Sequence, residues 1–392
     1  MKKVLFMLSS MNIGGVEKSF LSLLTEIPKE KYDITLLLLE KKGGFLEYIP
    51  DWVKVEEASW FHSVKPVIMQ PPQQTIKDYV KNKQYLKVPG FIFSYYISKY
   101  LNNRHFYYKQ IFKSIPPHEN TYDVAISYQG STDIIDYYIA HKVKAPKKIS
   151  WVHFDISKHQ VNKRLYTKLY KRFNQIYVVS KEAKRRLIEQ IPTAKIKAET
   201  FMNIVPANLI NEMAKETIKF DETYKGIKIV TVGRLSKEKG QDMAIKVLSR
   251  LRKAGYDVRW YCIGDGNNRK EYERLIRDYG LKNDFWLLGS TPNPYPFISN
   301  ADIYVQTSRH EGYCLTLAEA KCLLKPIITT NFTGAYEQVK DGYNGFIVDC
   351  SEDELYKKLK YLIENPLQRK IFIENLKTND VNSTFKTQKL SI

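Results

Sequence analysis

The residues best suited to chemistry are two glutamates, Glu311 and Glu319, which lie eight positions apart in RHEGYCLTLAEAKCLLKPIITT (309–330). A strand is expected to end before this loop, and a helix to begin near Leu315. The backbone N–H groups from Gly312 to Leu315 would then face outward at the helix N-terminus, which favours a diphosphate. Glu311 would lie at the mouth beside a sugar, and Glu319 would accept from ribose hydroxyls. The alternative is a solvated helix face that carries two ordinary acids.

Two cations form a second candidate group. In GRLSKEKG (233–240), Arg234 and Lys239 follow a strand predicted at 228–233. Two cations at a strand end can neutralise a departing diphosphate without a divalent ion. The sequence contains no D-x-D pair, which argues against a metal-dependent site of that type. We therefore expect a metal-independent centre with no metal ligand and no cofactor.

The elements that must position these residues alternate between strand and helix. Helical patterns run from Val16 to Leu24 and from Gln241 to Lys253. The alternation indicates doubly wound α/β architecture, and its restart near residue 228 indicates two Rossmann-like domains in tandem. Strands are predicted at 2–8, 32–39, 122–128, 147–153, 175–180, 228–233, 258–264, 302–308 and 325–330.

The domain limits follow from this restart. We expect residues 1–205 to form an acceptor-side domain and 206–375 to form a domain that binds the nucleotide. Residues 376–392 would be a C-terminal tail that packs back on the first domain. The stretch FMNIVP (201–206) and the polar spacer up to Gly226 are predicted to be the hinge.

These motifs resemble those of the large GT-B family of retaining glycosyltransferases often called family 4, the glycosyl transferases group 1. EGYCLTLAE (311–319) is similar to the family's E-x7-E element, and GRLSKEKG resembles its G-R-x(3–4)-K-G element, 77 residues earlier. The resemblance covers nearly the whole chain and is most specific from 228 to 350. It implies two Rossmann-like domains that face across a cleft, and transfer of a sugar from a nucleotide diphosphate with retention of configuration.

The resemblance also implies roles for individual residues. Arg234 and Lys239 would bind the donor phosphates, and His153, at the end of KKISWVH, would face the donor sugar. Gly14-Gly15 would let backbone approach the diphosphate, and GDGNNR (264–269) would lie near the nucleoside. The predicted catalytic residues are His153, Arg234, Lys239 and Glu311. The predicted donor-binding residues are Gly14, Gly15, Arg234, Lys239, Glu311, Gly312, Tyr313, Cys314, Leu315 and Glu319.

Some of these residues also have a purely structural interpretation. Two other positions depart from the family pattern. Gly14-Gly15 would otherwise be an ordinary tight turn, and His153 a core histidine. Cys314 stands where a glycine is usual, and Thr333-Gly334 replaces a more typical Gly-Gly pair. The added Cys314 side chain would narrow the space beside the donor sugar.

The composition of the chain indicates its compartment and its possible partners. The chain carries 62 Lys and Arg against 42 Asp and Glu, a formal charge of +20. Its four cysteines lack C-x-x-C spacing and are expected to be reduced, and no signal-peptide core or membrane span is apparent. We expect a cytoplasmic protein that is peripheral on the inner face of the plasma membrane. Lys-rich codon bias in an AT-rich genome is a plainer explanation of the charge.

A basic surface of this kind attracts either an anionic membrane surface or nucleic acid. No recognition helix, RRM signature or zinc pattern supports nucleic acid as a partner. The first domain is interrupted by an insertion at about 60–115, in which residues 85–115 interleave aromatic side chains with lysines. One interpretation is an ordinary helix pair with Tyr and Phe in its core. The other is an interfacial surface, with rings at the headgroup level and cations on lipid phosphates.

The expected reaction is transfer of a sugar from a nucleotide-sugar donor, with UDP as the expected nucleotide. The acceptor would be a glycan, a lipid-linked carrier or a polymer in bacterial surface polysaccharide or cell-wall synthesis, a step that rests on analogy. One alternative is a sugar-nucleotide epimerase of the same fold, which free epimerised sugar would reveal. Another is a non-catalytic partner subunit, which would usually have lost the charged site residues that are present here.

Overall fold

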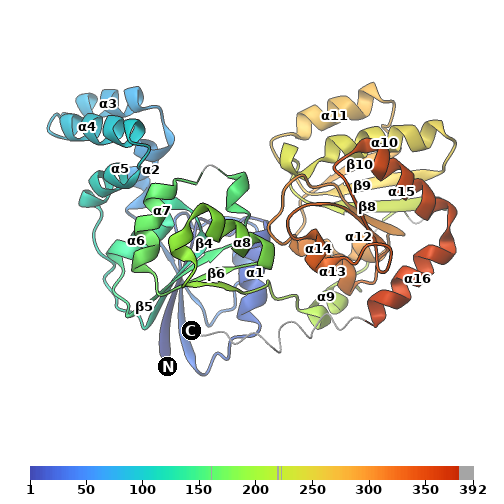
Figure 1. Ribbon diagram of the computed structural model, residues 1–392, viewed down its shortest axis with the longest axis horizontal. Coiled ribbons are helices and arrows are strands. Elements are labelled where there is room, and N and C mark those ends of the chain that lie inside the picture. The colour runs from blue at the N-terminus through green and yellow to red at the C-terminus, as the bar shows by residue number, and fades with distance from the viewer. Residues whose placement is uncertain (160, 219, 222, 379–392) are drawn as a thin grey trace. The chain divides into compact units, whose positions relative to one another are not determined.

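The computed structural model describes residues 1–159, 161–218, 220–221 and 223–378 (Figure 1). Its contacts divide the chain into two compact units, each described by itself below. Of the described residues, the first unit comprises 1–12 and 26–201, and the second comprises 13–25 and 202–378. Of the predicted C-terminal tail, residues 379–392 lie outside the described residues.

The first unit is built on a parallel sheet of seven strands in the order β3-β2-β1-β4-β5-β6-β7. Helices cover both faces of such a sheet, so its central strands are apolar without interruption, as in VLFML (4–8), where every residue is buried. The strands are β1 (Lys2–Leu8), β2 (Tyr32–Leu38), β3 (Lys54–Glu57), β4 (Val124–Gly130), β5 (Lys147–Val152), β6 (Gln175–Val178) and β7 (Ala198–Thr200). The main helices of this sheet are α6 (Asp133–Lys142), α7 (Lys163–Leu169) and α8 (Lys181–Gln190).

The second unit has a parallel sheet of six strands in the order β10-β9-β8-β11-β12-β13. Alternate side chains enter two cores: Trp260 and Cys262 of β9 pack in one, and Tyr261 and Ile263 in the other. The strands are β8 (Ile227–Val232), β9 (Val258–Ile263), β10 (Phe285–Gly289), β11 (Ile303–Gln306), β12 (Ile327–Thr330) and β13 (Phe346–Val348).

Helices fill the two cores of this second sheet from opposite faces. The first core takes side chains from α10 (Gln241–Lys253), α11 (Arg269–Asp278), α15 (Glu352–Glu364) and α16 (Pro366–Lys377). The second takes them from α9 (Ala207–Met213), α12 (Tyr295–Ser299), α13 (Leu315–Cys322) and α14 (Ala335–Gln338). Helix α1 (Gly15–Leu24) follows β1 in the chain, but its contacts place it in the second unit, where it lies against α13.

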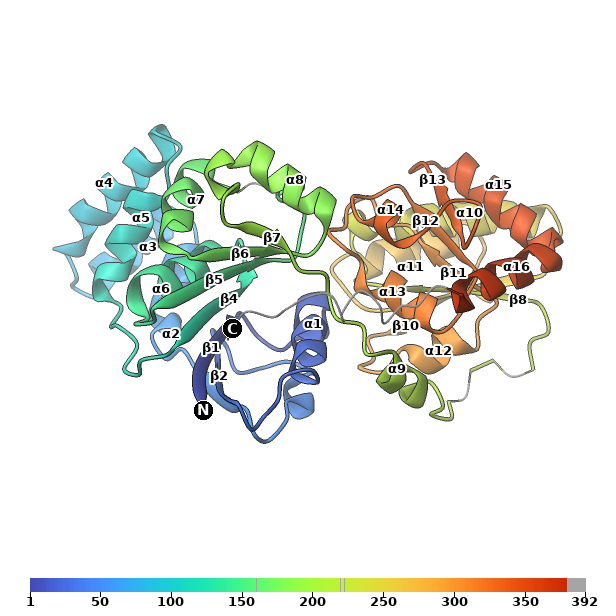
Figure 2. The same cartoon turned by 60° about the horizontal axis from the view of Figure 1, so that its bottom comes forward.

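The insertion forms four helices, α2 (Phe61–Met69), α3 (Pro72–Lys81), α4 (Lys87–Tyr100) and α5 (His105–Ile111). Two of them, α4 and α5, are the helix pair expected within residues 85–115. Figures 1 and 2 show α3, α4 and α5 grouped together, apart from the strands of their sheet. Rings of Tyr79, Phe91, Tyr95 and Tyr107 contact one another between these helices. Within the described ranges, no helix combines the length and the apolar character needed to cross a membrane.

The fold class predicted from the sequence is confirmed. The four strands that the sequence analysis did not predict, β3, β7, β10 and β13, are the edge strands of the two sheets. Edge strands are short and have one unpaired side, so they need no continuous apolar run. β3 illustrates this, since its sequence KVEE is polar and none of its side chains is fully buried.

Candidate functional site

The two motifs with the strongest chemistry meet at one point of the second sheet. GRLSKEKG follows β8, and the loop with Glu311 follows β11, and these strands are neighbours with Ile229 opposite Ile303. The strand order reverses between β8 and β11. In open parallel sheets, ligands bind outside the carboxyl ends of the strands at this switch point. The topology therefore explains why segments more than 70 residues apart can form one site.

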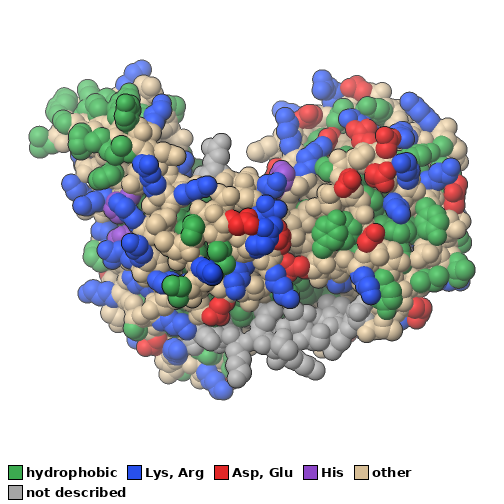
Figure 3. Space-filling model, viewed as in Figure 1, with side chains coloured by type: hydrophobic (Ala, Val, Ile, Leu, Met, Phe, Trp, Pro, Cys, Tyr) green, Lys and Arg blue, Asp and Glu red, His purple; other side chains and the backbone are tan. Residues whose placement is uncertain are grey.

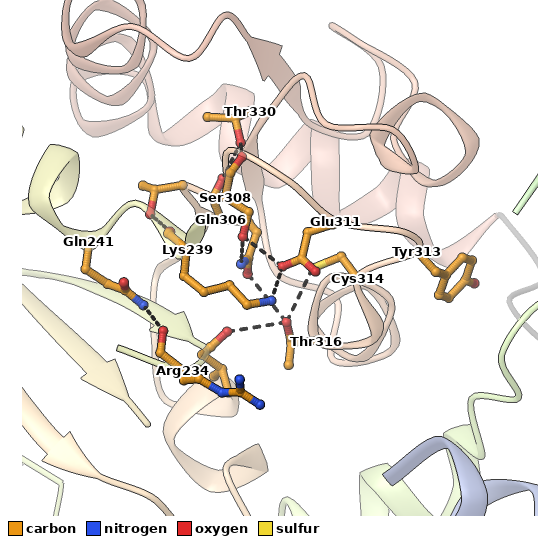
Figure 4. Close-up of polar contacts among 12 residues, drawn as sticks. Arg234, Lys239, Gln241, Gln306, Ser308, Glu311, Tyr313, Cys314, Thr316 and Thr330 are labelled. Carbon is orange, nitrogen blue, oxygen red and sulfur yellow. Dashed lines mark hydrogen bonds and ion pairs between the residues drawn. The ribbon is translucent and has the colours of Figure 1, made fainter. Parts of the chain in front are cut away.

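At this point Lys239 and Glu311 form an ion pair (Figure 4). The Ser308 hydroxyl also donates to Glu311 Oε1, at 2.8 Å. Burial alone would lower the pKa of the Lys239 ammonium, but the Glu311 carboxylate raises it, and the net pKa lies above the ordinary value. Lys239 is thus held as a cation at the site, and Glu311 is the group that holds it.

The Glu311 loop ends at the N-terminus of α13. Among the described residues, the backbone amides of Gly312, Tyr313, Cys314 and Leu315 have no intramolecular acceptor. The Gln338 side chain donates instead to the Tyr313 and Cys314 carbonyl groups, which fixes the loop from its other side. Four amides without acceptors at a helix N-terminus can bind an anion.

Cys314 gives a physical reason for the glycine that is usual at its position. Its backbone has φ 65°, in the left-handed region that glycine adopts without steric cost. The side chain is buried, and its Sγ atom lies 3.5 Å from the Thr316 hydroxyl. The cysteine is therefore accommodated against the first turn of its own helix.

Glu319 lies one turn inside α13 and is 1% exposed. Its Oε1 atom accepts from the Tyr295 hydroxyl at 3.1 Å and forms an ion pair with Lys18 Nζ at 2.9 Å. Lys18 also lies over the Tyr295 ring, 4.3 Å from its centroid. Glu319 Oε2 is buried and has no hydrogen-bond partner in the part of the chain that the structure describes. A buried carboxylate oxygen without a partner is costly unless a ligand supplies a donor.

Arg234 and the Gly14-Gly15 loop are further candidate residues of the second unit. The Arg234 side chain is exposed, and Figure 4 shows its guanidinium clear of the Lys239–Glu311 contacts. Burial raises the pKa of the Glu17 carboxyl to about 7, although its own backbone amide and the Arg234 charge lower it. A Cβ atom built on Gly15 would meet nothing within 4 Å, so open space borders the backbone there.

His153 belongs to the first unit, where it follows β5. Its ring lies beside those of Trp151 and Tyr128, and its Nε2 atom is buried and has no partner among the described residues. Burial lowers the pKa of His153 to about 3, against the raising effect of a hydrogen bond with the Tyr128 backbone. The imidazole is therefore neutral at pH 7 and can act through hydrogen bonds, but not as a cation.

Glycines let three loops of the second unit pack against each other. A Cβ atom on Gly240 (φ 72°) would lie 2.2 Å from the Thr307 carbonyl oxygen, and one on Gly264 (φ 144°) 2.1 Å from that of Gly233. One on Gly266 would lie 2.4 Å from the Leu235 carbonyl oxygen. GDGNNR is thus packed directly on the loop that carries Arg234.

Several residues at the site were missed by the sequence analysis. Arg309 makes a bidentate ion pair with Asp242 at 2.7 and 2.9 Å, which joins the two motif loops. Lys18 and Tyr295 hold Glu319, but they come from helices about 300 and 24 residues away in the chain. The only sequence signal for Lys18 was its place just after Gly14-Gly15, and Tyr295 had none.

Comparison with known proteins gives the site its family. Residues 214–379 match the family model described as glycosyl transferases group 1. An N-acetylgalactosamine-N,N'-diacetylbacillosaminyl-diphospho-undecaprenol 4-alpha-N-acetylgalactosaminyltransferase of Campylobacter jejuni is 28% identical over 56% of this chain and 58% of its own length. The chain spans about half the length of three curated relatives that it matches, at 58%, 42% and 57%.

Two longer matches cover nearly the whole chain. A second Campylobacter jejuni protein, named as a GalNAc-alpha-(1->4)-GalNAc-alpha-(1->3)-diNAcBac-PP-undecaprenol alpha-1,4-N-acetyl-D-galactosaminyltransferase, is 23% identical over 96% of this chain and 93% of its own. The crystal structure of HepE from Anabaena in complex with UDP-glucose has a TM-score of 0.71 at 18% identity and covers 98% of both chains. The fold is therefore GT-B, and residues 214–379 of this chain form a glycosyl transferases group 1 domain.

Proposed function

We propose that this protein is a retaining, metal-independent glycosyltransferase that moves a sugar from a nucleotide-diphosphate donor to an acceptor hydroxyl. The observation that carries the proposal is the set of unused binding groups at the β8–β11 switch point. Among the described residues, four amides at the start of α13 have no acceptor and follow directly after Glu311, the partner of the Lys239 cation. Glu319 Oε2, a turn further along, has no donor there either. These groups match a diphosphate and a ribose in the order that a nucleotide presents them.

The charges fit the bond that must break. In the reaction, the bond from the anomeric carbon to the diphosphate oxygen breaks, and one from that carbon to the acceptor oxygen forms. Negative charge grows on the diphosphate, where Lys239, Arg234 and the α13 amides stabilise it. The acceptor proton moves to the leaving diphosphate oxygen, so the protein needs no nucleophile for attack on the same face.

Glu311 has a double role in this proposal. In the free protein it neutralises and positions Lys239. When the diphosphate binds, Lys239 exchanges part of this contact for phosphate oxygens, and Glu311 becomes free to accept from a sugar hydroxyl. His153 is proposed to act toward the sugar as a neutral hydrogen-bonding group, because burial lowers its pKa to about 3 and excludes the cation at pH 7.

We propose UDP as the nucleotide and a glycan or lipid-linked glycan as the acceptor. The support for UDP is that solved structures of the same fold, HepE among them, are described as complexes with UDP or UDP-glucose. The support for the acceptor is that two relatives are named as transferases of undecaprenol-linked sugars. A role in bacterial surface polysaccharide or cell-wall glycan synthesis follows from such an acceptor.

The proposal is tested by incubating the purified full chain with UDP-, GDP- and ADP-sugars and short glycan or prenyl-diphosphate-linked acceptors. We expect release of UDP with formation of a glycoside whose anomeric configuration, assigned by NMR, equals that of the donor. Turnover should persist in excess EDTA. An inverted product would refute retention, loss in EDTA that Mg²⁺ restores would refute metal independence, and epimerised free sugar would favour an epimerase.

A further inference from the structure

The insertion of the first unit has a charge balance unlike that of the rest of the chain. Residues 61–114 contain nine Lys and Arg and a single acid, Asp78. Asp78 accepts from the amide groups of Gln70 and Gln74 instead of from a lysine. Only Lys65 and Arg104 have acidic partners, Glu40 and Asp133, in the described chain. The charges of the remaining seven lysines are therefore available to interact with solvent or with an anionic partner.

Helix α4 exposes large aromatic residues and buries small polar ones, the reverse of an ordinary surface helix. Ser94 and Ser98 are buried and face the protein, whereas Phe93, Tyr96 and Tyr100 are 67%, 57% and 93% exposed. Leu86, directly before the helix, is 97% exposed. At 3.6 residues per turn, positions 86, 93, 96 and 100 fall on one side of the helix. We call these four residues the α4 face.

The buried side of α4 explains how this inversion is stable. Ser94 satisfies its hydroxyl by donating to the Phe91 carbonyl group at 3.0 Å. Gly90 lies so close to α5 that a Cβ atom would be 2.8 Å from the Gln110 amide nitrogen. Small residues at 90, 94 and 98 therefore bring α4 close to its neighbour. Phe91 is buried between the helices, whereas Phe93, Tyr96 and Tyr100 are left outside.

Four lysines lie on α4 and on the neighbouring helix α3. Lys87 and Lys99 are at the two ends of α4, each about 120° around the helix from Phe93. Lys77 and Lys81, one turn apart on α3, add two further charges, and all four are exposed without an acidic partner in the described chain. Figure 3 shows hydrophobic side chains gathered on this part of the surface with Lys and Arg around them.

We propose that the α4 face and its lysines dock this protein on an anionic lipid bilayer. Exposed aromatic and aliphatic side chains at the level of the headgroups, with cations beside them, have the chemistry of an interfacial helix. A second copy of this surface would bring like charges together, which opposes self-association through it. The rings of Phe93, Tyr96 and Tyr100 would suit bases as well as lipid, but Leu86 offers no ring on which a base could stack, and its 97% exposure suits a bilayer.

Docking goes beyond the proposed sugar transfer and does not depend on it, because it concerns only the first unit. It is therefore measured without donor or acceptor. The full chain is sedimented with vesicles of phosphatidylcholine alone or with about one third phosphatidylglycerol, whose anionic headgroups give the surface a negative potential. We expect binding to the anionic vesicles at 0.1 M salt and a steep loss at 1 M, where the Debye length falls from about 10 to 3 Å.

Two variants separate the charged and apolar contributions. Replacing Lys77, Lys81, Lys87 and Lys99 with Gln should weaken binding to anionic vesicles at least about tenfold, since each lysine near the surface contributes about fivefold. The matched control replaces the exposed Lys195, Lys253, Lys270 and Lys282 with Gln and should bind nearly as tightly as the wild type.

The apolar variant carries Leu86→Ser, Phe93→Ser and Tyr100→Ser. It should also weaken binding at least about tenfold. Its control replaces exposed apolar residues elsewhere, Ile196, Leu209 and Leu367, with Ser. Circular dichroism spectra and thermal unfolding midpoints should be unchanged in all four variants, which rules out unfolding as the cause.

Equal binding to neutral and anionic vesicles would overturn the proposal, as would controls as weak as the test variants. Sedimentation velocity is run on the same samples. If the α4-face substitutions change the mass of the protein in solution and leave vesicle binding intact, the surface joins copies of the chain and lipid docking is refuted.

Discussion

Asp136 in the first unit and Glu319 in the second are both buried carboxylates, 0% and 1% exposed, but their oxygens have different partners. Asp136 Oδ1 accepts from the Ser150 hydroxyl at 3.0 Å, and Oδ2 from the Tyr166 hydroxyl at 2.9 Å. Glu319 uses only Oε1, and its buried Oε2 has no donor among the described residues.

The difference separates a structural acid from a binding acid. Buried polar atoms in folded proteins are almost always paired. Both carboxylate oxygens of Asp136 are hydrogen-bonded inside its own unit, so the free energy of these bonds contributes to the stability of the fold. Glu319 lacks a hydrogen bond to Oε2 until a ligand donates one, so part of its hydrogen-bond free energy is gained only on ligand binding. The same contrast extends to the backbone amides at the start of α13, which have no acceptor among the described residues.

The largest expected effect tests whether the charges of the second unit serve the reaction. Lys239→Ala should lower kcat by roughly 10²–10³-fold, as the loss of other electrostatic stabilisers of a transition state does. Lys237→Ala is the control, because Lys237 lies in the same turn without an acidic partner in the described chain. Nucleotide release is measured with saturating donor. Equal kcat for the two variants would place Lys239 outside the reaction.

The next prediction tests Asp136 through pH. Burial raises its pKa from 3.8 to about 7, although the hydroxyl groups that donate to it act to lower the value. The folded state therefore holds a proton that the unfolded state releases above about pH 4. Stability is full below that pH and falls as pH rises toward 7, by at most about 1.4 kcal/mol per unit.

In Asp136→Asn this slope should be absent. Its unfolding free energy relative to the wild type should therefore improve by roughly 3 kcal/mol between pH 4.5 and pH 8. Urea unfolding followed by fluorescence at several pH values measures the difference. Parallel curves for the two proteins would show that Asp136 is ionised in the folded state.

The third prediction tests whether Glu319, unlike Asp136, binds a ligand. Glu319→Gln keeps an oxygen for Tyr295 but loses the charge, so it should weaken nucleoside-diphosphate binding by about 1.5–3 kcal/mol. Calorimetry with UDP measures this, and Asp136→Asn serves as the control with unchanged affinity. If the two variants bind UDP equally well, Oε2 is not a ligand-binding atom and the contrast between the acids fails.

The smallest expected effect concerns Cys314. Cys314→Gly relieves a left-handed backbone but removes a buried side chain, so the two terms should leave stability within about 1 kcal/mol of the wild type. Cys314→Val should cost about 2 kcal/mol more, because a branched side chain resists φ 65°. Similar unfolding midpoints for the Gly and Val variants would show that the backbone there is not under constraint.

Much of the fold could be predicted because the central strands are continuous apolar runs. The edge strands could not, since β3 and β7 pair on only one side and their sequences need not be apolar. At the site, Arg234, Lys239, Glu311 and Glu319 could be found because each lies in a short motif of fixed spacing. Their roles stay predictions.

The residues that contact these groups could not be predicted from the sequence, for a different reason. Lys18 and Tyr295 contact Glu319 only after the chain has folded, and no local pattern links them. The pairing of Lys239 with Glu311 was likewise not foreseen, because both had been assigned to a ligand. Sequence motifs identify the groups that meet a ligand, whereas the contacts among these groups in the free protein depend on tertiary structure.

The close packing of the glycine loops has a consequence for anyone who wishes to alter the donor preference by mutagenesis. Gly240, Gly264 and Gly266 have no room for even one carbon atom, since each faces a backbone oxygen at 2.1–2.4 Å. Library diversity spent on these codons would yield mostly misfolded clones. Tyr313 and Thr333 are better targets: Tyr313 carries one of the α13 amides, Thr333 precedes Gly334, which packs on Gly312 and Tyr313, and neither target has a left-handed backbone.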